Sequence, residues 1–136
     1  MIRECAAAFI VRQNKILLGK RSATRRFYPG VWDVFGGHRK AGETLEEALR
    51  RELSEELGIV VTQGRFLLTA EEPNAEKYGE IRYHIYLVTE WSGEPENLQP
   101  KEHEIVRWFD FDEALKLPFA HSLYAETIKQ IQIEEP

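Results

Sequence analysis

Residues 37–59 constrain the fold of this chain more than any other stretch. Four leucines there recur at helical spacing and predict one buried seam of a helix: Leu45, Leu49, Leu53 and Leu57. Thr44 can cap the N-terminus of this helix, and Glu47, three residues later, completes a capping box. Gly58 stands where helices commonly end, at a position that tolerates a left-handed backbone. The stretch therefore predicts an amphipathic helix between Thr44 and Gly58.

Three carboxylates lie beside this seam, at spacings that place them on one helical face: Glu52, Glu55 and Glu56. Carboxylates held close together repel each other, unless they are solvated, one is protonated, or a cation lies between them. Magnesium suits such a set because it takes oxygen ligands and is usually completed by substrate phosphates. The alternative is an acidic helix face that is simply solvated. The residues around the helix favour the metal site.

The glutamates belong to a longer pattern, G-x5-E-x7-R-E-U-x-E-E-x-G-U, in which U is apolar. Its fixed letters are all present: Gly37, Glu43, Arg51, Glu52, Glu55, Glu56 and Gly58, with Leu53 and Ile59 at the apolar positions. Seven fixed letters at roughly 7% usage each make a chance match on the order of one in 10⁸ per start position. The chain therefore resembles the Nudix hydrolases, and among them the small MutT-like proteins. This resemblance implies an α/β/α sandwich with a mixed central sheet.

The rest of the chain agrees with that fold class. Apolar runs and alternating patterns predict strands at residues 4–11, 15–20, 60–70, 81–89 and 105–109, with a hairpin at Gln13-Asn14 and a possible bulge at Gly64. Asp112 is a candidate cap for a short helix through Leu117, and Ser122 for a final helix through Ile131. Strands and helices interleave without a regular repeat, which indicates a mixed sheet covered on both faces. We expect residues 1–136 to form a single domain.

The resemblance also implies roles for the residues of the pattern. Glu52, Glu55 and Glu56 would hold Mg²⁺ or Mn²⁺, with a backbone carbonyl near Gly37. Arg51 would pair with one of these glutamates and fix its rotamer, or form a surface ion pair with Glu47 or Glu55. The remaining carboxylate, Glu43, would lie outside the metal ligands or bind an additional metal carried by the substrate.

Two further residues match MutT-like relatives outside the pattern. The general base in some relatives lies on a loop before the last core strand, and here Glu102 has the best spacing to Trp108. Glu104 is the second candidate, and a solvated loop is the plain alternative. If Glu102 is not the general base, Glu52 or Glu55 would accept the proton of the attacking water. Arg21 matches an arginine that binds substrate phosphate, although a solvated strand end gives the same pattern.

The substrate is less constrained than the family. Many MutT-like patterns begin with Pro-Gly-Gly, whereas this chain has Phe35-Gly36-Gly37, and His121 stands near the position of a purine-reading asparagine. Specificity for 8-oxo-dGTP therefore does not carry over. We expect a nucleoside triphosphate or deoxynucleoside triphosphate, with ADP-ribose or another nucleoside diphosphate derivative as the alternative. The four histidines lack zinc spacing, and we place His38 and His84 at most near the site.

Composition limits the partners. The formal net charge of −5 argues against binding of nucleic acid polymers or an anionic membrane, and no apolar run is long enough to cross a bilayer. The one cysteine, Cys5, cannot form an internal disulfide, and the N-terminus lacks the pattern of a signal peptide. We therefore expect a cytoplasmic protein that binds a small nucleotide. A homodimer is left open.

Two other functions remain. A Nudix module without catalytic activity could bind a nucleotide and regulate a partner, although such modules usually have incomplete patterns. An isopentenyl diphosphate isomerase has the same fold and uses a catalytic cysteine, whereas Cys5 lies in an apolar strand context.

Overall fold

The structure is a computed structural model that describes residues 1–134. These residues form a seven-stranded sheet: β1 (Arg3–Arg12), β2 (Lys15–Arg21), β3 (Trp32–Asp33), β4 (Phe35–His38), β5 (Val60–Glu71), β6 (Ile81–Ser92) and β7 (His103–Asp110). The main path runs β3-β2-β1-β6-β5, with β4 paired to β1 and β7 paired to β2. Strands β1 and β6 are parallel and the other pairs are antiparallel, which confirms the predicted mixed sheet.

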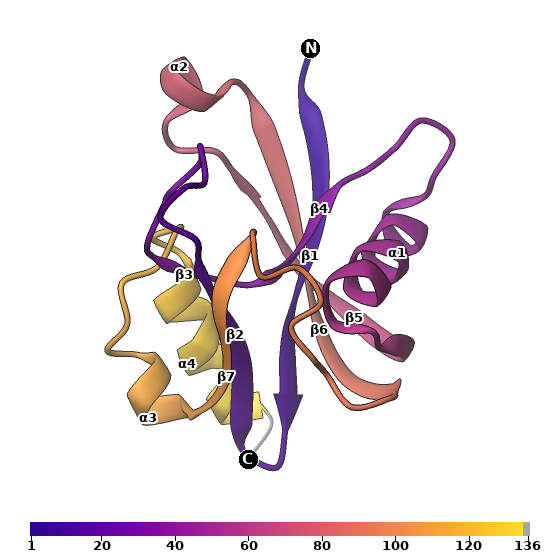
Figure 1. The fold of residues 1–136 in the computed structure, drawn as a ribbon, viewed down its shortest axis with the longest axis vertical. Helices are drawn as coiled ribbons and strands as arrows, with labels where there is room; N and C mark the ends of the chain where they lie inside the picture. Colours follow the sequence, from indigo (N-terminus) through magenta and orange to yellow (C-terminus); the bar gives the residue numbers. More distant parts are fainter. Residues whose placement is uncertain (135–136) are drawn as a thin grey trace.

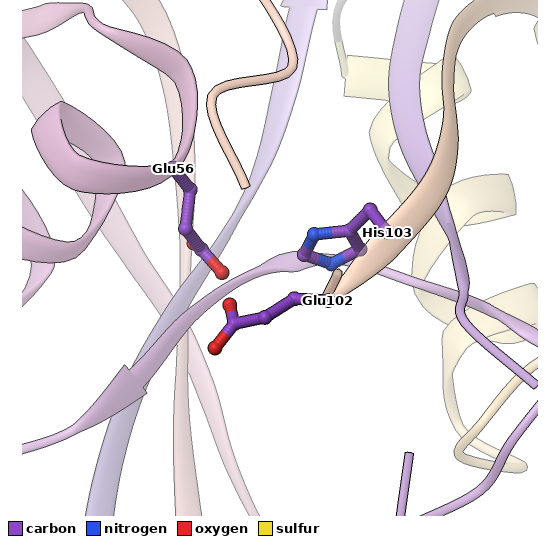
Figure 2. Close-up of side chains that lie close together, drawn as sticks. All are labelled: Glu56, Glu102 and His103. Carbon is purple, nitrogen blue, oxygen red and sulfur yellow. The ribbon is translucent and has the colours of Figure 1, made fainter. Parts of the chain in front are cut away.

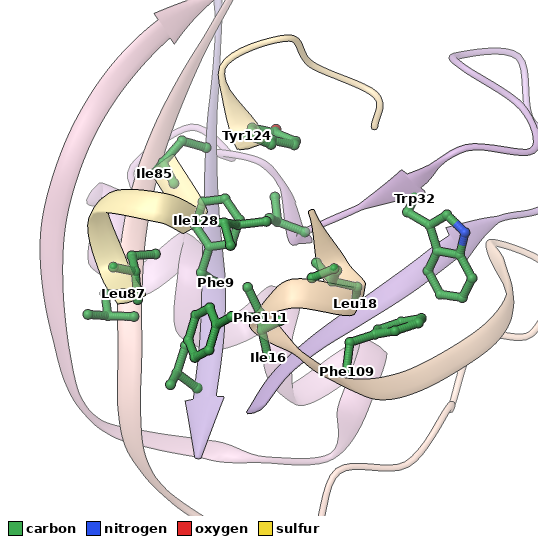
Figure 3. Close-up of a cluster of buried hydrophobic side chains, with 14 of the residues drawn as sticks. Phe9, Ile16, Leu18, Trp32, Ile85, Leu87, Phe109, Phe111, Tyr124 and Ile128 are labelled. Carbon is green, nitrogen blue, oxygen red and sulfur yellow. The ribbon is translucent and has the colours of Figure 1, made fainter. Parts of the chain in front are cut away.

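Helices cover both faces of this sheet (Figure 1). They are α1 (Leu45–Leu57), α2 (Ala75–Tyr78), α3 (Phe111–Ala114) and α4 (Tyr124–Glu134). The leucine seam of α1 packs on one face in a core that includes Ala8 and Ile10 of β1. Phe9 of the same strand points the other way, into a second core with Phe111 of α3 and Ile128 of α4 (Figure 3). The α/β/α sandwich is confirmed.

Helix α1 begins and ends where its sequence predicts. The Thr44 side chain accepts a hydrogen bond from the Glu47 N–H, and the Glu47 carboxylate accepts one from the Thr44 N–H. Gly58 ends the helix in the left-handed region at φ 71°, where its N–H reaches the carbonyl of Ser54. Leu49, Leu53 and Leu57 are buried, whereas Leu45 is only partly buried at the first turn. The capping residues thus set the ends of α1, and burial of its leucines holds the helix against the sheet.

The last two helices differ from their predicted bounds. The short helix α3 ends at Ala114, before Leu117, and its cap is Asp110 instead of Asp112. The Glu113 carboxylate accepts a hydrogen bond from the Asp110 N–H, and burial of Phe111 fixes the first helical residue. Helix α4 begins at Tyr124, later than a Ser122 cap would place it, and it continues to Glu134.

The strands are longer than predicted, and the centre of β6 is buried on both faces. Its central residues Ile85, Tyr86, Leu87 and Val88 are all buried, because helices cover both faces of the sheet there. The predicted hairpin turn is present at Gln13 and Asn14, both with positive φ. The register of β5 on β6 shifts beside Gly64, as a bulge requires. The loop before β6 contains the short helix α2.

A change of partner along β1 creates the space for a site. Ala8 of β1 pairs with Phe35 of β4, whereas Ile10, two residues later, pairs with Leu17 of β2. Strands β2 and β4 therefore lie on the same side of β1 at different heights, and residues from both strands line a cavity. Within residues 1–134, every helix falls short of the length and apolar character needed to cross a membrane.

Candidate active site

Helix α1 presents its glutamates at different depths. Glu56 is buried, with 3% of its surface exposed, whereas the side chain of Glu55 is 45% exposed. Glu52 lies between these extremes, one turn before Glu56. The three carboxylates therefore follow the expected helical face, and that face runs from the protein interior to solvent.

Strand β4 passes close to these carboxylates because it contains two glycines. The Gly36 N–H donates a hydrogen bond of 2.9 Å to Oε2 of Glu56. A Cβ on Gly37 would lie 2.6 Å from the carboxyl group of Glu52, and one on Gly36 would lie 2.1 Å from the carbonyl oxygen of Ala6. Side chains at these two positions would separate β4 from α1 and β1. The Gly-Gly pair is thus a steric requirement of the site.

Arg51 connects the helix to the loop before it. Its Nε donates to Oε2 of Glu43 at 2.7 Å, its Nη1 to Oε1 of Glu52 at 2.9 Å, and its Nη2 to the carbonyl oxygen of His38 at 2.9 Å. Nη1 also lies 3.4 Å from Glu55. The hydrogen bond from Arg51 lowers the pKa of Glu43 to about 2. Both alternatives from the sequence therefore coexist: Arg51 orients Glu52 and also forms the surface pair with Glu55.

The charges of the site favour a cation. Burial, followed by the charges of Glu52 and Glu102, raises the pKa of Glu56 well above its usual value. Burial also raises the pKa of Glu52, although the hydrogen bond from Arg51 opposes this shift. A divalent ion would offset the repulsion that both shifts express. The oxygen-only donor set of these carboxylates, with the Gly37 backbone close to the Glu52 carboxyl group, fits such an ion.

Glu102 comes from a distant loop and approaches the same helix. Its carboxyl oxygen, one from Glu56 and a ring nitrogen of His103 lie within 4.8 Å of one another (Figure 2). The Ser22 N–H donates to the carbonyl oxygen of Glu102 at 2.9 Å, which holds this loop beside the end of β2. Glu104 instead pairs with Lys20, at 3.6 Å. Of the two candidate bases, Glu102 is therefore the one beside the α1 glutamates.

Arg21 lies inside the protein and not on a solvated strand end. Only 8% of its surface is exposed, and Nη1 pairs with Asp33 at 2.9 Å while Nε donates to the carbonyl oxygen of Phe27. Burial raises the pKa of Asp33, although Arg21 opposes that shift. Arg21 lines the cavity, and these two bonds leave further guanidinium donors for a ligand.

The cavity between β2, β4 and β6 has a volume of about 280 Å³. Glu56, Gly37 and His103 line the end nearest α1, and Arg21 and Arg25 contribute positive charge to its wall. Tyr28, Glu72 and Tyr83 form another part of the wall. A polyanion with a planar group could therefore place its charged end near the glutamates and its ring among aromatic side chains.

Sequence reasoning missed two residues of this cavity. His103 is 3% exposed, and burial, followed by the charges of Arg25 and Arg21, lowers its pKa to about 4. Its place next to Glu102 in the sequence was the available signal. Glu72 is 6% exposed and accepts hydrogen bonds from Tyr83 and Tyr28, and no sequence pattern singles it out. His38 lines the cavity, whereas His84 lies outside it and contacts Glu4.

The structure thus places the clustered glutamates of helix α1 beside a polar cavity in an α/β/α sandwich. A family model described as the NUDIX domain matches residues 1–131, and the chain belongs to this family. The chain is 36% identical to the CTP pyrophosphohydrolase of Escherichia coli, over 86% of this chain and 82% of that protein. It is 32% identical to the oxidized purine nucleoside triphosphate hydrolase of Danio rerio, over 88% of this chain and 70% of that protein.

Solved structures agree with the family. The fold is similar to that of a MutT NUDIX hydrolase from Burkholderia pseudomallei, with a TM-score of 0.86 and 32% identity. The match covers 96% of this chain and 98% of that chain. The resemblance to small MutT-like members, first indicated by the sequence pattern, is thereby confirmed over nearly the whole chain.

Proposed function

We propose that this chain hydrolyses a nucleoside triphosphate or deoxynucleoside triphosphate, using Mg²⁺ or Mn²⁺ held by Glu52, Glu55 and Glu56 with the Gly37 carbonyl. The enzyme class follows from the family and from relatives named pyrophosphohydrolase and triphosphate hydrolase. Members of this family generally need a divalent metal. The further parts of the proposal are a single domain over residues 1–136 and a cytoplasmic location. The identity of the ion, the roles of individual residues and the substrate are also proposed.

The observation that carries the proposal is the meeting of Glu102 with the α1 glutamates at the end of the cavity. In the proposed reaction, a water oxygen bonds to phosphorus, the anhydride P–O bond breaks, and the leaving phosphate group takes the bonding electrons. Glu102 accepts the proton of the attacking water. An ion held by Glu52, Glu55 and Glu56 would neutralise phosphate oxygens and would lower the pKa of the water.

The remaining residues position these groups. Arg51 holds the carboxylate of Glu52 through the hydrogen bond of 2.9 Å, and it holds Glu43 through Nε. Arg21 contacts a substrate phosphate with the donors that Asp33 and Phe27 leave free. Both arginines have second partners, so their side chains are fixed before the substrate binds.

A nucleotide panel tests the proposal. Purified protein is incubated with CTP, dCTP, ATP, GTP and 8-oxo-dGTP, and with ADP-ribose for the alternative substrate class, in Mg²⁺, in Mn²⁺ and in excess chelator. We expect metal-dependent release of a nucleotide product from at least one triphosphate. Reaction in H₂¹⁸O identifies the phosphorus that is attacked. Turnover confined to ADP-ribose favours the alternative substrate, and absence of turnover with all six favours a binding module without catalytic activity.

A further inference from the structure

Glu72 is a buried carboxylate at the cavity wall, apart from the glutamates of α1. It is 6% exposed and directly follows β5. Its Oε2 accepts hydrogen bonds from the Tyr28 hydroxyl and from the Asn74 N–H, the latter at 2.8 Å. Its Oε1 accepts one from the Tyr83 hydroxyl at 2.6 Å. Burial acts to raise the pKa of Glu72, but these bonds outweigh it and lower the pKa below its usual value. Glu72 is therefore an ionised carboxylate in a fixed orientation.

Glu72 and its two tyrosines present only hydrogen-bond acceptors to the cavity. The hydroxyl protons of Tyr28 and Tyr83 are both directed at the carboxylate, which has no proton to give in return. The hydroxyl oxygens therefore keep only their lone pairs for a ligand. A carboxylate oxygen can accept two hydrogen bonds, and within residues 1–134 Oε1 of Glu72 accepts one. This oxygen has an open acceptor position.

The neighbouring histidine of the cavity wall does not supply the missing donor. The ring centroid of His121 lies 6.1 Å from that of Tyr83. Its Nδ1 accepts a hydrogen bond from the Leu123 N–H at 3.1 Å, so Nε2 carries the ring hydrogen and donates it to the carbonyl oxygen of Glu71 at 3.0 Å. Both ring nitrogens are thus used. The open position on Glu72 calls for a donor that belongs to the ligand.

The Glu72 cluster lies at the end of the cavity away from α1. Tyr83 packs against the core that contains Phe9 and Tyr124, on the face of the sheet that α4 covers. Glu56, which lines the other end of the cavity, belongs to α1 on the opposite face. A buried carboxylate repels phosphate groups. The Glu72 end therefore receives the uncharged base of a nucleotide whose phosphates lie near α1.

We propose that Glu72 selects nucleobases with an exocyclic amino group, through a hydrogen bond from that group to Oε1. This inference rests on the proposed function, because it names the bases that the same site takes. Cytosine, adenine and guanine each have an exocyclic amino group. Uracil and thymine have only carbonyl oxygens in its place, and their single N–H lies between two of them. Those oxygens would face the acceptors of Glu72 and its tyrosines and would leave Oε1 without a partner, which is unfavourable.

Nucleoside monophosphates test this selection without the reaction, because they have no anhydride bond. Calorimetry compares CMP, AMP and GMP, each with the analogue that lacks only the amino group: the pyrimidin-2-one nucleotide, the purine nucleotide and inosine monophosphate. UMP is measured beside them. We expect at least one amino nucleotide to bind at least about tenfold more tightly than both its analogue and UMP, as for a hydrogen bond to a charged group. The proposal is overturned if none of the three does so.

Glu72→Gln assigns the selection to this residue, because its amide replaces one acceptor oxygen by a donor. We expect the preference for the best amino nucleotide over UMP to fall by about tenfold, whereas exposed Glu71→Gln should keep the wild-type preference. An unchanged preference in folded Glu72→Gln overturns the role of Glu72. If circular dichroism shows this variant to be unfolded, nuclear Overhauser effects are measured in the wild type between base protons of the bound nucleotide and ring protons of Tyr28 and Tyr83. Their absence overturns the placement of the base.

Turnover separates this proposal from the proposed function. With Mg²⁺, kcat/KM for the triphosphate of the best amino nucleotide should exceed that for UTP by at least about tenfold, and this ratio should fall in Glu72→Gln. A binding preference without hydrolysis of any nucleotide overturns the proposed function and leaves the selection by Glu72 in place. Hydrolysis with equal kcat/KM for both triphosphates overturns the selection and leaves the proposed function in place.

Discussion

The carboxyl group of Glu52 occupies the space where a side chain at Gly37 would lie. A Cβ built on Gly37 comes within 2.6 Å of the Glu52 carboxyl carbon and of one of its oxygens. The first glycine of the pattern and its first helical glutamate are therefore joined by direct contact, although the sequence separates them by a loop and two turns of helix. The hydrogen bond from Arg51 holds the glutamate in that position.

Gly37→Ala is expected to displace the Glu52 carboxylate and to weaken divalent metal binding by about tenfold or more. Mn²⁺ affinity measured by calorimetry checks this. Gly64→Ala is the matched control, because a Cβ there meets its nearest neighbour at an ordinary 3.6 Å and lies far from the site. Equal affinities in Gly37→Ala and wild type would show that the glycine is not needed for the position of Glu52.

Arg51→Lys keeps the positive charge but removes the planar fork that binds Glu43, Glu52 and the His38 carbonyl. We expect kcat to fall by about tenfold or more while the protein remains folded, because Glu52 loses its orienting contact. Arg50→Lys, at an exposed position of the same helix, serves as the control and should behave as wild type. Equal kcat values for the two variants would contradict the orienting role.

Glu56→Gln should stabilise the metal-free protein at neutral pH. Burial and the neighbouring carboxylates raise the pKa of Glu56 well above 4.5. The folded state therefore binds more protons than the unfolded state above pH 4.5, and wild-type stability falls as pH rises through that range. Thermal unfolding from pH 4 to pH 8 checks this, with exposed Glu46→Gln as the control. The difference in unfolding temperature between Glu56→Gln and wild type should disappear at pH 4. A Glu56→Gln protein that is less stable than wild type at pH 7 would contradict the raised pKa of Glu56.

Thermal unfolding in the presence of Mn²⁺ should make the wild type more stable than Glu56→Gln, the opposite of the order in the metal-free proteins. An ion that binds the folded state raises its stability by mass action, and Glu56→Gln loses one ligand. We expect the wild type to gain more in unfolding temperature than the variant at equal Mn²⁺. Equal gains would show that Glu56 does not hold the ion.

Glu72→Gln should have the opposite pH dependence. Burial acts to raise the pKa of Glu72, but hydrogen bonds from Tyr28, Tyr83 and the Asn74 N–H outweigh it and lower the pKa below 4.5. Its contribution to stability is therefore present above pH 4.5 and is lost as pH falls through the folded pKa. Urea unfolding should show that Glu72→Gln is less stable than wild type at pH 7 and that this difference in free energy of unfolding becomes smaller in acid. The control Glu71→Gln, at an exposed position, should have the stability of wild type at every pH. A difference in stability that does not change with pH would show that it does not come from the ionised carboxylate of Glu72.

The sequence predicts most of this fold because its signals are local. The leucine seam, the Thr44 cap and Gly58 each act within a few residues, and α1 has the bounds they predict. The cap of α3 was predicted wrongly because burial of Phe111, a tertiary effect, selected Asp110 over Asp112. The centre of β6 is buried on both faces for a similar reason, since the helices that cover it are distant in sequence.

The residues of the site likewise differ in whether local sequence signals predict them. The glutamates of α1 lie on one helix, so spacing alone predicts their common face. The approach of Glu102 to Glu56 and the burial of Arg21 depend on strands that are distant in sequence, and family resemblance alone suggested their roles. Neither pattern nor resemblance singled out Glu72 and His103, because their hydrogen bonding and burial exist only in the folded chain.

The dependence of kcat on pH in Glu102→Gln tests the central claim most directly. Wild type, Glu102→Gln and Glu104→Gln are compared at saturating Mg²⁺ with the best nucleotide from the panel, and Glu104 is the control because it pairs with Lys20. We predict that Glu102→Gln lowers kcat by about a hundredfold or more and flattens the acidic limb of the profile, which reports the essential base. Glu104→Gln should have the kcat and the acidic limb of the wild type. A Glu102→Gln enzyme with near-normal kcat and an unchanged acidic limb would show that the proton goes elsewhere.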